Sequence, residues 1–252
     1  MSRRKNKQIA IEDIEEMESY LNSRNQEEAT LFDLIKINVK CKTENQKKLV
    51  RSIKTNTFTI VSGLAGSGKT FLSCAEALKL LKNTQKYKRI VLIKSITPLK
   101  NEEVGHLPGD LKEKMSPIME SYMDNIRKLI GRSRMEKMVE LGLIEIVPIA
   151  FARGRTMDNS VIIIDEAQNI SRDNIRTLMT RIGYNSKMII LGDIKQKDIR
   201  NKKDSSLEII LEKFKDKEGF GSVELRNPED VVRNPIINTV EQVFDEIDES
   251  NE

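Results

Sequence analysis

Residues 63–70 read GLAGSGKT, which has the form G-x-x-x-x-G-K-[ST]. In this pattern Gly63 and Gly68 let the chain turn tightly and bring its amides close to phosphate oxygens. The ammonium group of Lys69 then binds the β- and γ-phosphates, and the hydroxyl group of Thr70 ligates Mg²⁺. An apolar run precedes the stretch and a helical pattern follows it, as this chemistry requires. The stretch therefore predicts a loop that binds the phosphates of a nucleotide.

A second stretch, SVIIIDEAQN, is a continuous apolar run that ends in two acids, Asp165 and Glu166. Open α/β sheets bind ligands at the carboxyl ends of their strands, where both carboxylates are expected. We expect Asp165 to hold Mg²⁺ through water and Glu166 to polarise the attacking water. The alternative is a pair of acids that only terminates a strand. The adjacent acids favour hydrolysis over transfer of the phosphate to a small molecule.

Two glutamines are further candidates. Gln196, in GDIKQKD, could sense the γ-phosphate and orient water, or lie in a polar loop without a role. Gln46 precedes the glycine-rich stretch, and its amide offers the donor and acceptor that an adenine edge needs. From the residue alone, a solvent-facing helical glutamine is the favoured interpretation of Gln46.

These residues are embedded in a rhythm of apolar runs and helical patterns. Predicted strands cover 57–63, 89–95, 144–150, 160–169, 186–193 and 221–226. Predicted helices cover 69–83, 110–141, 174–182 and 234–247. Runs that are apolar throughout are buried on both faces, as in parallel sheets. Their alternation with helices predicts an α/β, doubly wound domain with a mostly parallel sheet flanked by helices.

This domain, 43–252, is expected to follow an N-terminal extension, 1–42. In the extension we expect a loose segment over 1–8, a helix over 9–21 and a short strand over 34–39. A helix over 43–53, with Thr43 as N-cap, should open the domain. A solvated extension is the favoured interpretation of the N-terminal part, and an assembly arm is the alternative.

The composition limits the classes of protein. The chain has 252 residues, of which 38% are hydrophobic and 33% charged, as in a globular protein; its net charge of +4 neither requires nor excludes a polyanionic partner. Two cysteines, Cys41 and Cys74, are too few for a disulfide scaffold or a zinc site. No apolar run approaches the ~20 residues of a membrane span, and no signal-peptide core follows the basic N-terminus. We expect a soluble, cytoplasmic protein.

Several motifs occur together in one order. Gln46 is followed by GLAGSGKT, LPGDLKEK (107–114), RGRT (153–156), DEAQN, TRIGYNSKM, GDIKQKD and DVVRNP. This order resembles the PhoH family over about 200 residues of the chain. That family has a single RecA-like ATPase core related to the first domain of superfamily 1 helicases. The motifs are long and specific, above all LPGDLKEK, RGRT and DEAQN.

The resemblance implies an ATP-binding protein that uses Mg²⁺, forms a homo-oligomeric ring, by analogy a hexamer, and serves as an RNA helicase or in RNA processing. It makes Gln46 an adenine reader, Asp165 and Glu166 the Walker B pair, and Gln196 the γ-phosphate sensor. The implied nucleotide contacts are Gln46, Gly63, Leu64, Ala65, Gly66, Ser67, Gly68, Lys69, Thr70 and Phe71.

One departure concerns Lys94 in IKSITP, since the family has Thr-Arg-Pro at this place. Lysine keeps the charge of arginine but loses its bidentate fork, so Lys94 cannot make the two parallel hydrogen bonds of that arginine. Basic residues near the expected strand ends could contact RNA or single-stranded nucleic acid. They are Lys94, Lys100, Arg153, Arg155, Lys195, Lys197 and Arg200. The alternative is an ordinary solvated charge run, and Phe151 is the aromatic residue near a candidate loop.

Fast hydrolysis of the γ-phosphate also needs a cation on the transferring group, usually an arginine. The chain is too short for a second RecA domain, so a neighbouring copy is expected to supply it. Arg233 in DVVRNP is the first candidate and Arg181 in TRIG the second; helix capping or a surface ion pair is the alternative for both.

The leading hypothesis is therefore a Mg²⁺-dependent ATPase that couples hydrolysis to remodelling of RNA or another single-stranded nucleic acid. The alternative is a nucleotide-controlled assembly or recruitment protein with little turnover, which could serve a ribonuclease.

Overall fold

The computed structural model describes residues 2–94, 111–196 and 205–249, without the side chains of 2–16, 20 and 111–119. In these ranges a six-stranded sheet has the order β3-β2-β4-β5-β1-β6, and each neighbouring pair is parallel. The strands are β1 (Phe58–Gly63), β2 (Arg89–Lys94), β3 (Ile144–Ile146), β4 (Ser160–Asp165), β5 (Lys187–Gly192) and β6 (Phe220–Leu225).

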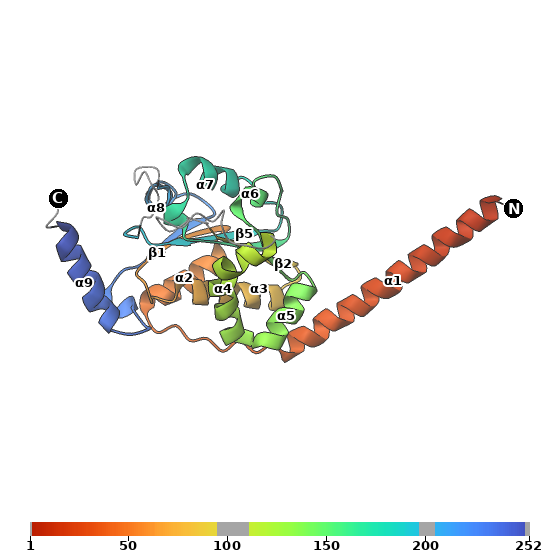
Figure 1. Cartoon of the computed structure of the whole chain (residues 1–252), viewed down its shortest axis with the longest axis horizontal. Coiled ribbons are helices and arrows are strands. Elements are labelled where there is room, and N and C mark those ends of the chain that lie inside the picture. Colours follow the sequence, from red (N-terminus) through yellow and green to blue (C-terminus); the bar gives the residue numbers. More distant parts are fainter. Residues whose placement is uncertain (1, 95–110, 197–204, 250–252) are drawn as a thin grey trace.

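Helices cover both faces of the sheet (Figure 1). One face carries α2 (Glu44–Thr55), α3 (Lys69–Asn83), α4 (Leu111–Ile130) and α5 (Arg132–Glu140); the other carries α6 (Ile149–Ala152), α7 (Arg172–Met179) and α8 (Leu207–Lys213). Consecutive strand residues alternate between two apolar clusters, so that Val61 packs with the first layer and Ile60 with the second. The predicted α/β fold class is confirmed.

The strand order brings the two motif-bearing strand ends close together. β5 lies between β1, which leads into GLAGSGKT, and β4, which ends at Asp165. Because the strands are parallel, the carboxyl ends of all three meet at one edge of the sheet. A third strand between the two motif-bearing strands is the RecA-like arrangement that the resemblance implies.

The N-terminal part differs from the prediction. α1 (Ser2–Leu34) is one continuous helix that projects from the body (Figure 1), so the loose segment over 1–8 is wrong. The strand over 34–39 is also wrong, because residues 35–42 have no regular secondary structure. The alternation was real, since Ile35 is buried and Ile37 and Val39 pack against the same core, but this extended segment lies on the domain without pairing to a strand.

Two short helices were not predicted. The expected strand over 144–150 ends at Ile146, and α6 follows Pro148, whose fixed φ suits a helix start. α8 was missed although Leu207, Ile210 and Leu211 share one buried face. After β6 come the 3-10 turn η4 (Pro228–Asp230) and α9 (Ile236–Glu249).

Candidate nucleotide site

The predicted phosphate loop joins β1 to α3 at the carboxyl edge of the sheet. Gly66 and Gly68 have φ values of 75° and 83°, in the left-handed region that favours glycine. A Cβ on Gly63 would lie 2.8 Å from both Cβ and O of Leu225. Leu64, Ala65 and Ser67 complete the loop, and Phe71 lies in the first turn of α3. The loop's shape therefore requires the glycines of the motif.

Lys69 is held by its own loop. Its Nζ donates to the carbonyl oxygens of Gly63 at 2.5 Å and Leu64 at 2.9 Å. Desolvation lowers the pKa of Lys69, and the nearby carboxylates, first Asp193 and then Asp165, oppose that shift. A phosphate group bound in the loop would offer this ammonium group a stronger, charged partner than the two carbonyls.

Thr70 and Asp165 lie in direct contact across the site. The Thr70 hydroxyl donates to Oδ2 of Asp165 at 2.9 Å, and the Glu166 N–H donates to Oδ1 at 3.0 Å. Burial raises the pKa of Asp165, and the neighbouring Glu166 charge adds to this, whereas the two hydrogen bonds lower it. A buried carboxylate beside a hydroxyl is a hard oxygen set that fits Mg²⁺, and a cation there would relieve the cost of the buried charge.

Glu166 is positioned by a residue to which the sequence analysis gave no role. Its backbone is in the left-handed region, with φ of 55°, and Gln168 Nε2 donates to its Oε2 at 2.7 Å. Oε1 of the buried Gln168 accepts from the Asp193 N–H at 3.1 Å. A Cβ on Gly192 would lie 2.4 Å from that same Oε1. Gln168 thus connects the end of β4 to the end of β5.

The end of β5 contributes Asp193, also missed by sequence reasoning. Asp193 is 5% exposed, and its Oδ2 has no hydrogen-bond partner among the described residues. Oδ1 accepts from the Lys195 N–H at 3.0 Å. Gln196, the predicted γ-phosphate sensor, is exposed, and its N–H donates to the Asp193 carbonyl at 3.2 Å. The sensor role of Gln196 stays a prediction.

Gln46 lies behind the phosphate loop rather than in solvent. Only 3% of it is exposed; Nε2 donates to the Ser67 carbonyl at 2.9 Å, and Oε1 accepts from the Lys42 N–H at 2.7 Å. Thr43 caps α2, as predicted, by accepting from the Gln46 N–H. The solvent-facing interpretation of Gln46 is therefore wrong, while its contact with adenine stays a prediction.

A buried carboxylate ties the C-terminal segment to this region. Asp230 is fully buried and accepts from Thr43 Oγ1 at 2.7 Å, Asn45 Nδ2 at 2.8 Å and the Asn227 N–H at 3.1 Å. Two residues later, the Val232 N–H donates to the Gly66 carbonyl at 3.1 Å. The start of α2, the phosphate loop and the segment after η4 therefore form one unit.

The two candidate arginines lie at different ends of the sheet. Arg233 is exposed, and its Cβ lies 3.1 Å from where a Cβ on Gly66 would stand, beside its own phosphate loop. Arg181 follows α7, and its carbonyl accepts from the Met157 N–H at 2.9 Å, just before β4 begins. Arg181 is thus at the amino edge, opposite the site in its own chain.

The basic residues predicted to contact nucleic acid are not equivalent. Lys94 Nζ donates to Ser121 Oγ at 3.0 Å, and Lys195 pairs with Asp245. Arg155 pairs with Glu145, whereas Arg153 is exposed. Lys100, Lys197 and Arg200 lie outside the described residues. Within the part of the chain that the structure describes, no helix is both long and apolar enough to cross a membrane.

The fold and the glycine-rich loop define a domain with a P-loop NTPase fold. The family model described as PhoH-like protein matches residues 38–245, and the chain belongs to this family. The PhoH-like protein of Bacillus subtilis is 37% identical over 207 residues, which are 82% of this chain and 64% of that protein. Protein PhoH of Escherichia coli K12 is 34% identical over 197 residues, 77% of this chain and 55% of that protein. The chain thus spans less than two thirds of either relative.

Solved structures of other proteins resemble the fold more distantly. The large terminase of a thermophilic bacteriophage has a TM-score of 0.48 and 8% identity, and covers 79% of this chain and 49% of its own. A Bacteroides Pif1 in complex with ADP-AlF4 has a TM-score of 0.37 and 17% identity, and covers 76% of this chain and 43% of its own. At these TM-scores neither likeness bears on activity.

Replacing Asp165 by asparagine should stabilise the metal-free protein while weakening Mg²⁺ binding. Ionisation of the buried carboxylate costs stability at pH values above its raised pKa, and asparagine removes this cost. We expect the free energy of unfolding to rise at pH 7, because the buried carboxylate is ionised there in wild type and asparagine carries no charge. Urea denaturation of the variant and of wild type measures this free energy.

The difference between Asp165→Asn and wild type should shrink as the pH falls and Asp165 takes up its proton. Asp124→Asn, at a carboxyl whose side chain is 51% exposed, is the control. A lower free energy of unfolding for Asp165→Asn than for wild type at pH 7, or a difference that is the same at pH 7 and in acid, would contradict the cost assigned to the buried charge.

Proposed function

We propose that this chain is a Mg²⁺-dependent ATPase that acts on RNA or another single-stranded nucleic acid as a ring-forming motor. The observation that carries the ATPase proposal is the meeting of Lys69, Thr70, Asp165 and Glu166 at one edge of the sheet, linked by the Thr70–Asp165 hydrogen bond. Membership of the PhoH-like family supports it. The nucleic-acid and ring proposals rest on the family resemblance and on the basic residues near the strand ends.

In this mechanism each residue acts on a stated group. Lys69 binds the β- and γ-phosphates, and Thr70 and Asp165 would hold Mg²⁺, which would supply positive charge to the phosphate oxygens when bound. Glu166 accepts a hydrogen bond from the attacking water and orients it. Gln168 holds the Glu166 carboxylate at 2.7 Å and is itself fixed by the Asp193 N–H. Positioning and electrostatics therefore supply the catalysis.

Glu166→Gln should bind ATP but lose turnover by about 10²-fold or more, because the amide cannot act as a base. Steady-state phosphate release and the binding of a fluorescent ATP analogue measure the two effects. Glu140→Gln, at a carboxylate whose side chain is 69% exposed, is the matched control. Turnover of Glu166→Gln at the wild-type rate would exclude Glu166 as the base.

One observation favours a second candidate, the nucleotide-controlled assembly or recruitment protein. A Cβ on Gly66 would stand 3.0 Å from Cδ1 of Ile237 in α9, so α9 rests on the phosphate loop. α9 also exposes Ile236, Val240 and Phe244. Under this candidate a Glu166→Gln protein keeps full biological function, whereas the ATPase proposal requires it to fail.

We propose that Gln46 also reads adenine. Gln46→Ala should then weaken the binding of ATP by about 10-fold, or 1.4 kcal/mol, and weaken the binding of GTP much less. Titration with fluorescent ATP and GTP analogues tests this. Because the Gln46 amide also supports Ser67 and Lys42, an equal loss for both nucleotides would show that Gln46 only shapes the loop.

We propose that Arg181 completes the site of a neighbouring copy. It lies at the sheet edge opposite its own phosphate loop, so it can reach an ATP site only in another chain. Arg233, beside its own loop, suits a contact within its own site. An arginine finger contributes about 10³–10⁵ in rate.

Arg181→Ala and Lys69→Ala should each be inactive, while a mixture of the two should recover part of the ATPase rate, because each supplies what the other lacks. The rate per chain of wild type should also fall on dilution. An inactive mixture together with a concentration-independent rate would show that one chain holds the whole site.

A further inference from the structure

The segment that follows β3 exposes some of its residues and buries others. Phe151, in α6, is 57% exposed, and Arg153, Gly154 and Thr156 are exposed as well. Ala152 and Met157 are fully buried, and the Arg155 side chain is 36% exposed. A Cβ on Gly154 would meet nothing within 4 Å, so the backbone there is open to an approaching ligand.

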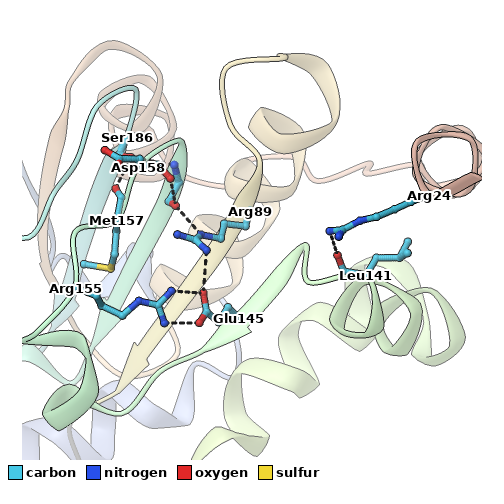
Figure 2. Close-up of polar contacts among 9 residues, drawn as sticks. Arg24, Arg89, Leu141, Glu145, Arg155, Met157, Asp158 and Ser186 are labelled. Carbon is cyan, nitrogen blue, oxygen red and sulfur yellow. Dashed lines mark hydrogen bonds and ion pairs between the residues drawn. The ribbon is translucent and has the colours of Figure 1, made fainter. Parts of the chain in front are cut away.

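The inward residues are fastened, as Figure 2 shows. Arg155 donates to both carboxylate oxygens of Glu145, from Nη1 at 2.5 Å and Nη2 at 3.0 Å. Arg89 reaches the same carboxylate at 3.5 Å and donates to Ser160 Oγ at 3.1 Å. Glu145 is on β3, Arg89 opens β2 and Ser160 opens β4, so the network joins the RGRT segment to three neighbouring strands.

The end of the segment is fastened too. The Met157 N–H donates to the Arg181 carbonyl at 2.9 Å, and the Met157 carbonyl accepts from Ser186 Oγ at 2.7 Å. At its start, α6 packs against β2, and the Val147 N–H donates to the Leu92 carbonyl at 2.9 Å. The outward residues between these anchors are held on a rigid support.

The two arginines of RGRT therefore differ in what their side chains contact. The fork of Arg155 is already occupied by a carboxylate, and a phosphate would have to displace Glu145 to gain it. Arg153 is exposed and lies two residues from the exposed ring of Phe151. An exposed aromatic ring and an exposed cation on one short segment, next to open backbone at Gly154, are groups that can bind a single strand by stacking and by phosphate contact.

The position of the segment agrees with this use. β2 ends at Lys94, which stands in register with Asp165 of β4. α6 packs on β2, so Phe151 belongs to the layer next to the strand that borders the Mg²⁺ ligand. A single-stranded nucleic acid bound at this segment would therefore lie in the layer beside β2, whose neighbour β4 carries Asp165 of the nucleotide site.

We propose that Phe151 stacks on a base and Arg153 binds a phosphate of a single-stranded nucleic acid, and that Arg155 is a positioning residue that acts through Glu145. This inference rests on the proposed nucleic-acid function and names the contacts of that function. Stacking and phosphate contacts carry no base preference, so the strand is bound without sequence specificity.

The first test is the binding of a fluorescein-labelled oligo(U) of 20 nucleotides to the full chain, measured by anisotropy. Phe151→Ala should raise the Kd about tenfold, the effect of one stacked base. Tyr184→Ala is the matched control, because Tyr184 is 88% exposed but lies just before β5 at the amino edge. A Kd for Phe151→Ala equal to that of the control would overturn the stacking role.

The second test is the salt dependence of the same binding, which counts phosphate contacts. Arg153→Ala should weaken binding and reduce the slope of log K against log[salt] by about 0.7, the value for one contact to a single strand. Arg155→Ala should raise the Kd roughly three- to tenfold with the slope unchanged, because it loosens the segment without removing a contact. Arg51→Ala, at an exposed arginine of α2, is the control for charge alone.

If Arg155 acts by positioning the segment, two further results are expected. Glu145→Gln together with Arg155→Ala should bind no worse than Arg155→Ala alone, because both break one interaction. Arg155→Lys should recover part of the affinity, since lysine keeps one bond to Glu145. A slope reduced by Arg155→Ala would instead make Arg155 a direct phosphate contact, and an unchanged Kd would leave it a structural residue only; either result overturns its assignment.

Binding of a fluorescent ATP analogue and thermal melting accompany each variant. Retained ATP binding and melting temperature show that a loss of oligo(U) binding is local. If wild type binds ATP but neither oligo(U) nor oligo(dT), the inference fails while the ATPase proposal stands. If wild type does not bind ATP, the ATPase proposal itself is overturned.

Discussion

The hydrogen bond from Thr70 to Asp165 joins the two halves of the candidate site. It connects the first turn of α3 to the end of β4, two positions 95 residues apart in the chain. The bond can form because the strands of the sheet are parallel and their carboxyl ends meet at one edge. The buried Asp165 then has a raised pKa, which a Mg²⁺ ion would reverse. Burial thus prepares this carboxylate for a cation.

Near that bond, single buried residues form hydrogen bonds that join one element to another. Gln168 holds Glu166 and takes the Asp193 N–H, so the end of β5 fixes the proposed base. Asp230 joins the start of α2 to the segment that contacts Gly66. The phosphate loop is therefore held by the segment after η4, and Ile237 of α9 lies against the same loop. A change in the loop would reach Glu166 and α9 through different contacts.

The sequence predicted the parts of the molecule that local patterns encode. The fully apolar runs predicted the parallel sheet, and GLAGSGKT and DEAQN predicted Lys69, Thr70 and Asp165 at one edge. Gln168 and Asp193 escaped because their roles depend on a contact between strand ends. The 34–39 segment misled because alternation records one buried face, which an extended segment on helices shows as well as a strand. Arg155 was grouped with Arg153 because only the structure shows its carboxylate partner.

We propose that Thr70 and Asp165 form, with a nucleotide, a Mg²⁺ site. The most direct test is calorimetric titration of ATP into the full chain, in Mg²⁺ and again in EDTA. Because Thr70 and Asp165 would hold a Mg²⁺ ion whose charge favours binding of the phosphates, we predict that ATP binds at least about tenfold more tightly with Mg²⁺ than without it. Equal affinity in the two buffers would contradict the assignment.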